Sequence, residues 1–203
     1  MDNKTLNPFL SVWLHPKQTA RYMIDHKTLG FAAVILLVCS IISLPVNLLG
    51  WGEPVSLGSV ISMAIFSPIV TILGVAFSVL IIWGIGKLFK GSSTYADMFK
   101  AMSIVSIPSI ILSPFYLIWF IVEPEVMLYY DYLPPYPAFF TVIALLSFII
   151  LIWGFVLSVG VVAEAHRFSN WRAFFTLMVP VTILFVILFT LFALAFWAMF
   201  STF

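Results

Sequence analysis

The chain has very little charge. Only 8% of its 203 residues are Asp, Glu, Lys or Arg, whereas 63% are hydrophobic. A soluble domain carries about a quarter charged residues, so this composition does not suit a soluble globule. A lipid bilayer acts as an apolar solvent for exposed hydrophobic side chains, and it accounts for the composition. The sequence therefore predicts a polytopic integral membrane protein.

Several kinds of chemistry are also missing. The single cysteine, Cys39, lies in an apolar run and cannot form an intramolecular disulfide, so we interpret it as a core residue. No basic patch is present that would neutralise phosphates, and nucleic acid is not an expected partner. The sequence has no HxxxH or HExxH motif and no glycine-rich phosphate loop. We therefore expect no metal and no cofactor.

Long uncharged segments dominate what is present. Each is long enough for a spanning helix, which needs about 20 residues. They are Leu29–Leu49, Leu57–Gly84, Met102–Val122, Ala138–Ala163 and Ala173–Phe203. We predict an all-α bundle of five transmembrane helices, with residues 29–203 as one membrane domain and residues 1–28 as an amphipathic cytosolic segment. Proton pumps and intramembrane aspartyl proteases need buried ionisable groups that these segments lack, and we do not expect an enzyme.

The loop charges predict an orientation. Every Lys and Arg lies in the N-terminal segment, in the link between spans two and three, or in the link between spans four and five. The other two links, Gly50–Ser56 and Glu123–Pro137, carry only acidic charge. By the positive-inside rule, the N-terminus is cytosolic and the C-terminus lies outside, as five spans require. The acidic outer link fits a cation site or a solvated loop with an aromatic belt, and we favour the loop. The aromatic residues of this belt are Trp51, Tyr129, Tyr130, Tyr132 and Tyr136.

The N-terminal segment is amphipathic. Asn7-Pro8 is typical of a helix start, and Pro16 suits a second one. In that second helix, apolar residues share one face and charged residues share the other. Such a helix is expected to lie in the membrane interface with its basic face toward headgroups. The candidate headgroup contacts are Lys17, Arg21 and Lys27.

Two later segments repeat this layout. Thr94-x-x-Asp97 resembles a capping box ahead of Pro108, and Ser169 can cap a helix ahead of Pro180. The two units suggest a degenerate repeat. The last apolar segment would be about 46 Å long as a helix, which exceeds a ~30 Å hydrocarbon core. The residues before Pro180, and by the same reasoning those before Pro108, therefore either span the membrane or lie along its interface.

Small residues recur along one face of the second and fourth spans. Such residues let two helices approach closely in lipid, so we expect these two spans to pack on each other. The alternative is that the small residues line a pore. The candidate packing residues are Ser67, Thr71, Gly74, Ser78, Gly154 and Ser158.

A cluster of polar residues follows the fourth span. By helix length, Glu164 lies at the headgroup boundary, where it can pair with Arg167 at i+3. One interpretation is an ordinary helix end with a Ser169 cap and a Trp171 anchor. The functional hypothesis is that Glu164 turns into the bundle and pairs with Lys87 or Arg172, which clamps the two cytosolic links together. The candidate interaction residues are Glu164, His166, Arg167, Trp171, Arg172, Lys87 and Tyr95.

Three stretches carry a resemblance to a known family. They are NPFLSVWLHPKQTARYMID at 7–25, GKLFKGSSTYADMFKAMSIVSIP at 86–108 and VAEAHRFSNWRAF at 162–174. Together they resemble the short prokaryotic branch of the Yip1-domain family. The resemblance implies five spans, a cytosolic N-terminus and a place in the bacterial cytoplasmic membrane. Eukaryotic members act in vesicle trafficking and contact small GTPases, but this sequence lacks their long cytosolic N-terminal region, and GTPase binding is not expected.

Two functions fit these observations. The first is a non-enzymatic membrane or envelope scaffold or adaptor, which acts through its cytosolic links on lipids, on other membrane proteins or on a second copy of itself. The second is a small facilitator or transporter that passes a neutral or lipid-like solute between kinked helices, since such a solute needs no buried charge.

Overall fold

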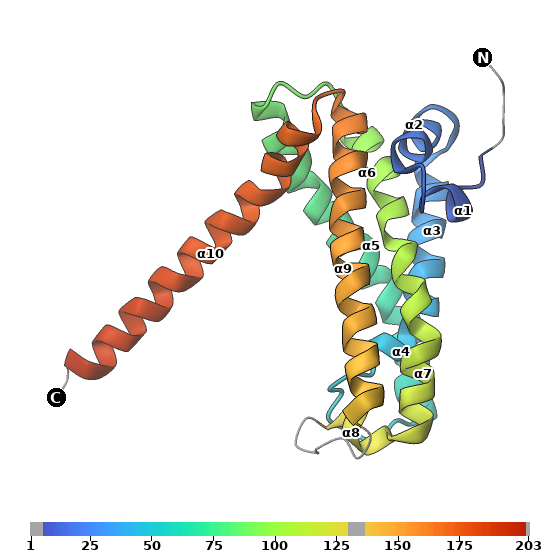
Figure 1. Ribbon diagram of the computed structural model, residues 1–203, viewed down its shortest axis with the longest axis vertical. Helices are drawn as coiled ribbons and strands as arrows, with labels where there is room; N and C mark the ends of the chain where they lie inside the picture. The colour runs from blue at the N-terminus through green and yellow to red at the C-terminus, as the bar shows by residue number, and fades with distance from the viewer. Residues whose placement is uncertain (1–5, 130–136, 202–203) are drawn as a thin grey trace.

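The computed structural model describes residues 6–129 and 137–201, and the regular structure of this part is helical throughout (Figure 1). Within it, four apolar stretches are long enough to cross a membrane: α5 (Leu57–Leu88), the run Tyr95–Val122, α9 (Pro137–His166) and α10 (Asn170–Ser201). The predicted all-α, polytopic membrane bundle is confirmed. The aromatic belt and acidic link lie partly at 130–136, outside the described residues.

The first predicted span is the short one. Its helix, α3 (Leu29–Ile42), has 14 residues and is followed by α4 (Leu44–Asn47). Fourteen residues rise only about 21 Å, less than a hydrocarbon core. The helix stops shortly before Pro45, which has no N–H to donate to the preceding turn and whose ring crowds the carbonyl four residues earlier.

The remaining helices are α1 (Pro8–Ser11), α2 (Pro16–His26), α6 (Tyr95–Ser103), η1 (Ile104–Ser106), η2 (Pro108–Leu112), α7 (Ser113–Val122) and α8 (Pro124–Leu128). Among them, α1, α2 and α6 begin where their sequence signals predicted, whereas no start was predicted for η1, α7 and α8. The Asn7 side chain accepts a hydrogen bond from the Phe9 N–H at 3.0 Å. The Thr94 hydroxyl accepts one from the Asp97 N–H at 3.1 Å. Both caps satisfy amides that the first helical turn leaves free.

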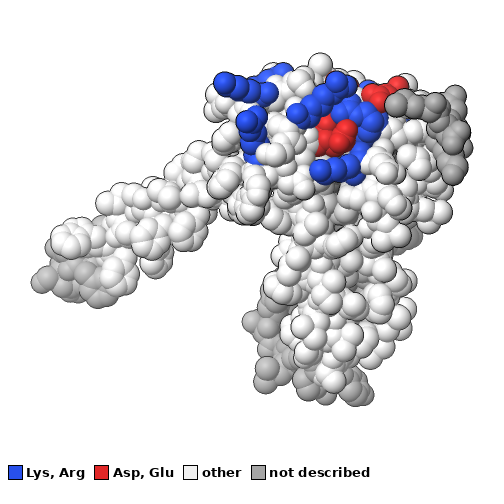
Figure 2. Space-filling view, turned by 45° about the horizontal axis from the view of Figure 1, so that its top comes forward, with Lys and Arg blue, Asp and Glu red and all other residues white. Residues whose placement is uncertain are grey.

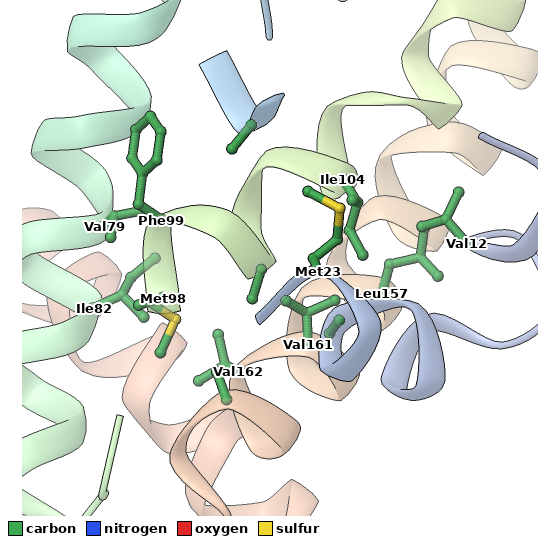
Figure 3. Close-up of a cluster of buried hydrophobic side chains, with 14 of the residues drawn as sticks. Val12, Met23, Val79, Ile82, Met98, Phe99, Ile104, Leu157, Val161 and Val162 are labelled. Atoms are coloured by element: carbon green, nitrogen blue, oxygen red, sulfur yellow. The ribbon is translucent and has the colours of Figure 1, made fainter. Parts of the chain in front are cut away.

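The main core surrounds α6, which contacts α2, α3, α5 and α9. Figure 3 shows Met23, Met98 and Val161, which come from α2, α6 and α9, within this cluster. Ala20 and Met23 are fully buried. The expectation that the apolar face of α2 lies on lipid is therefore wrong. That face is covered by α6 and α9. Contact with the protein core removes its apolar surface from water, which contact with lipid would also do.

A second cluster closes the opposite end of the bundle. It includes Trp119 and Met127, and the Trp119 Nε1–H donates to the Glu123 carboxylate at 3.1 Å. The Gly50 N–H donates to the Met127 carbonyl at 2.8 Å, which joins the two links at this end. Glu123, part of the predicted solvated link, is instead buried.

The last helix leans away from the others (Figure 1). Only the first turns of α10 pack on α5 and α9, and its residues from Val181 to Trp197 are all exposed. The helix continues through Pro180, so a break at this proline is excluded. A continuous helix of 32 residues is about 48 Å long, and a tilt reduces the bilayer thickness that it spans.

The two prolines act differently. Before Pro108 the chain leaves the α-helical conformation at Ile104 and passes through η1 and η2 into α7. Pro108 removes one hydrogen-bond donor, and the 3₁₀ turns tighten the backbone around it. The third span is therefore an interrupted helix that starts with α6.

The predicted close packing of the second and fourth spans is wrong. A methyl group added at Gly74 or at Gly154 would meet nothing within 4 Å in the described structure. The α6 helix contacts both α5 and α9, and so do the first turns of α10, which keeps the two spans apart. Ser78 and Ser158 instead line a groove of about 280 Å³ that Pro180 helps to close.

Candidate functional site: the basic end of the bundle

Basic residues gather at one end of the bundle, which we call the basic end. Figure 2 shows Lys and Arg side chains surrounding a few acidic ones there. Three chain segments meet at this end: α2, the link at 89–94 between α5 and α6, and the link at 167–169 between α9 and α10. These three segments form the candidate site.

The first link starts with a compact helix ending. Lys90 has a φ of 64°, in the left-handed region that glycine usually occupies. The Lys90 N–H donates to the Lys87 carbonyl at 3.0 Å, and the Gly91 N–H donates to the Gly86 carbonyl at 2.9 Å. This is the Schellman pattern, which satisfies the last carbonyls of α5.

The second link starts in the same way. Arg167 has a φ of 57°, and its N–H donates to the Glu164 carbonyl at 3.3 Å. The Phe168 N–H donates to the Ala163 carbonyl at 3.1 Å. Each link thus places a basic residue at the position that usually holds glycine and then enters a capped helix. The suggested repeat of 94–108 and 169–180 stays a prediction, because these two helix endings lie before its units.

Glu164 is paired, but not with the residues expected from the sequence. Its Oε1 lies 2.8 Å from Nη2 and 2.9 Å from Nε of Arg21, and Arg21 Nη2 also donates to the Glu164 carbonyl at 2.9 Å. The predicted pairing with Lys87 or Arg172 is wrong, because α2 packs on α9 and brings Arg21 to the end of that helix. A cation there also suits the negative end of the helix dipole.

Two further contacts tie the helix ends together. Ser92 donates to the His166 carbonyl at 3.1 Å from its N–H and at 3.1 Å from its hydroxyl. The Lys100 ammonium donates to the Ile24 carbonyl in the last turn of α2, and lies 3.4 Å from Asp97. The two links are therefore joined, by Ser92 and not by Glu164.

His166 acts as a buried packing residue. Its side chain is 1% exposed and its ring stacks on Phe168 at 5.0 Å. A Cβ at Gly86 would lie 2.1 Å from His166 Nε2, and a Cβ at Gly91 would lie 2.2 Å from Nδ1. Neither ring nitrogen has a hydrogen-bond partner among the described residues. The imidazole ring fills a slot that is open only because residues 86 and 91 are glycines and have no Cβ.

The aromatic candidates have separate places. The Tyr95 hydroxyl donates to the Ala76 carbonyl at 3.0 Å, and its ring meets Trp83 edge-on at 6.3 Å, which fixes α6 to α5. The Lys87 ammonium lies over the Trp83 ring at 5.9 Å. Trp171 is 72% exposed at the start of α10, and Arg172 is exposed beside it.

The three proposed headgroup contacts also differ. Arg21 is occupied by Glu164, and the Lys27 ammonium lies 4.6 Å from the Phe31 ring centroid. The stem of Lys17 is within contact distance of a Cβ built at Gly160, at 3.7 Å. Lys17 lines a groove that is described below, and Arg21 lines the polar cleft described next.

A polar hollow lies between α2, the two links and α6, and we call it the polar cleft. Its volume is about 460 Å³. It is lined by Arg21, Ile24, Asp25, Ser92, Ser93, Asp97, Ala165 and Arg167. The cleft therefore presents charges of both signs. Within 6–129 and 137–201, no group of three or more His, Cys, Asp or Glu side chains could hold a metal ion.

Ser92 and Lys100 were not predicted as site residues. The serines after Lys90 were a weak signal, since serine is common after a helix end. Lys100 gave no local signal, because its acceptor on Ile24 is 76 residues away along the chain.

Long apolar helices, with Lys and Arg gathered at one end of the bundle, define a polytopic integral membrane protein of the helical-bundle class. Residues 10–200 match the family model of the Yip1 domain, and the chain belongs to the Yip1 domain family. Neither a curated protein nor a solved structure matches the chain.

Proposed function

We propose that the protein is a non-enzymatic membrane adaptor whose basic end faces the cytosol and binds a partner protein in the polar cleft. The observation that carries this proposal is the mixture of charges around the cleft: Arg21 and Arg167 against Asp25 and Asp97. An anionic lipid headgroup would be repelled by the two aspartates. A protein surface can offer complementary charges of both signs, which gives an interface its specificity.

The walls of the cleft are held in place before any partner binds. Arg21 fixes α2 to α9, Lys100 fixes α6 to α2, and Ser92 fixes the first link to the second. A site that is already ordered loses less conformational entropy on binding. This supports a docking surface over a flexible tether.

Cross-linking from inside the cleft tests the proposal. A photo-reactive amino acid at Ser92, which lines the cleft and is exposed, is expected to form a cross-linked product in native membranes, either with a second copy or with another membrane protein. Reversing two cleft charges, with Asp25→Lys and Arg167→Glu, is expected to lower its yield about tenfold, since like charges facing each other across an interface cost at least ~1.4 kcal/mol.

Lys90→Glu is the matched control. Lys90 is also basic, exposed and in a left-handed conformation after a helix, but it does not line the cleft. Its substitution is expected to leave the yield of the cross-linked product unchanged. The adaptor proposal would be refuted if the charge-reversed variant gave the same yield as the unaltered protein. It would also be refuted if Lys90→Glu lowered the yield as much as the charge reversal does.

The orientation has its own test. In a variant with Cys39→Ala, single cysteines are placed at Lys90 and at Trp51, which lie at opposite ends of the bundle. A membrane-impermeant maleimide is expected to label Trp51→Cys in intact cells and Lys90→Cys only after the membrane is opened, because the positive-inside rule puts basic links in the cytosol. Labelling of Lys90→Cys in intact cells contradicts the proposed orientation.

The facilitator has less support. One hollow, of about 480 Å³, lies between η2 and α9 and reaches Leu112 and Ile150 of the cluster around Trp119. The other three lie nearer the basic end, and none of the four is lined by residues from both ends of the described bundle. No observation therefore favours a passage through the bundle.

A further inference from the structure

A second hollow, on the side of the basic end, differs from the polar cleft. It lies between the start of α2, the last part of α9 and the start of α10, and its volume is about 540 Å³. We call it the α2–α9–α10 groove. This volume falls within the range of about 300–1,000 Å³ that is usual for small-ligand pockets.

The floor of the groove is apolar. Phe155, Val156 and Val159 of α9 form it together with Phe174 of α10, and the two phenylalanine rings meet edge-on at 5.9 Å. Val156 is 49% exposed and belongs to a long uncharged segment. Water would hydrate this floor poorly, and a hydrocarbon chain suits it.

The rim of the groove is polar and carries positive charge alone. Lys17, His15 and Gln18 line it from α2, and Asn170 lines it from α10. No Asp or Glu is among its described lining residues. Both α2 and α10 begin here, and His15 gives α2 no side-chain capping bond. The positive ends of two helix dipoles therefore accompany the Lys17 ammonium, and such an environment favours an anion.

The depth of the groove agrees with a lipid. Val156 precedes the end of α9 at His166 by ten residues, which is about 15 Å of helix. The apolar floor thus extends from the charged end into the uncharged segment, as a headgroup with its acyl chain does. The polar cleft lacks this arrangement, since it has carboxylates and no apolar floor of comparable extent.

We infer that the α2–α9–α10 groove binds one anionic phospholipid, with the headgroup phosphate at Lys17 and an acyl chain along Phe155, Val156 and Val159. The site goes beyond the proposed adaptor function and does not depend on it, because no residue of the groove's rim or floor lines the polar cleft.

Lipid titration tests the site. The full-length protein, purified in a nonionic detergent, is titrated with phosphatidylglycerol and with phosphatidylcholine, and bound lipid is counted by native mass spectrometry. Lys17→Gln is expected to weaken phosphatidylglycerol binding about fivefold, which corresponds to the ~1 kcal/mol that one basic residue contributes near an anionic surface. Val156→Trp is expected to weaken binding of both lipids, because the indole occupies the space above the groove floor. The fold is expected to tolerate this substitution, because Val156 is exposed.

Lys90→Gln provides the control, since it removes the same charge from the basic end outside the groove. It is expected to leave the affinity unchanged. Equal weakening by Lys17→Gln and Lys90→Gln would overturn the inference in favour of general charge attraction. Displacement of the lipid by an equal concentration of inorganic phosphate would also overturn it. Cross-linking from Ser92 is expected to be unaffected by Lys17→Gln, so that the lipid site and the adaptor proposal can fail separately.

Discussion

Gly86→Ala is expected to lower the free energy of unfolding by about 2 kcal/mol. The added methyl carbon would lie 2.1 Å from His166 Nε2, and the ring cannot withdraw because it is buried and stacked on Phe168. Overpacking of this kind costs ~1–3 kcal/mol or more, while alanine in a helix regains up to ~1 kcal/mol over glycine. The measurement is an unfolding titration with sodium dodecyl sulfate in mixed micelles.

The helix offers a matched control for this prediction. Gly84 lies two residues earlier in α5, and a Cβ there would meet nothing within 4 Å. Gly84→Ala is therefore expected to be neutral or stabilising. In a His166→Ala background the slot is empty, and Gly86→Ala is expected to cost nothing more. If Gly86→Ala and Gly84→Ala have the same effect, the His166 ring does not occupy the slot.

Arg21→Glu is expected to have a still larger effect, a loss of about 3 kcal/mol in the free energy of unfolding. The substitution removes two hydrogen bonds of 2.9 Å and an ion-pair contact of 2.8 Å at the end of α9, and it places a second carboxylate beside Glu164. The pair is about 30% exposed, so water screens part of the repulsion. The expected cost falls between the ~1 kcal/mol of a surface pair and the ~3–5 kcal/mol of a broken buried pair.

The charge swap separates the pair from general charge effects. Adding Glu164→Arg to Arg21→Glu restores opposite charges and is expected to recover at least half of the lost stability. Arg172→Glu changes an exposed charge at the same end and is expected to leave the unfolding midpoint unchanged. If the double variant is no more stable than Arg21→Glu alone, Arg21 and Glu164 do not interact as the structure shows.

Local sequence signals predicted local structure well. Asn7, Thr94 and Ser169 cap the helices that they were expected to cap. These signals succeed because a cap acts on an amide two or three residues away. The number of apolar segments was equally readable, since a bilayer demands length and low charge from each segment by itself.

The effect of each proline depended on more than its presence. Pro108 lies where the helix gives way to 3₁₀ turns, whereas Pro180 is accommodated inside a continuous helix. Both residues lack the same N–H, and burial does not decide the difference, since Pro68 is buried like Pro108 and yet lies inside the continuous helix α5. The sequence therefore predicted a possible interruption of the helix at both prolines, but it did not show at which of them the helix is interrupted.

Composition and charge alone determined that this chain is a helical membrane protein with Lys and Arg grouped in three segments, because every spanning helix must satisfy its own backbone in lipid. Only the tertiary structure decided what those charges contact. Glu164 and Arg21 are 143 residues apart, and their pairing depends on α2 lying across α9. The slot for His166 depends on two glycines of another helix end. A sequence pattern reports neighbours within a turn or two, whereas these contacts arise from how separate helices pack.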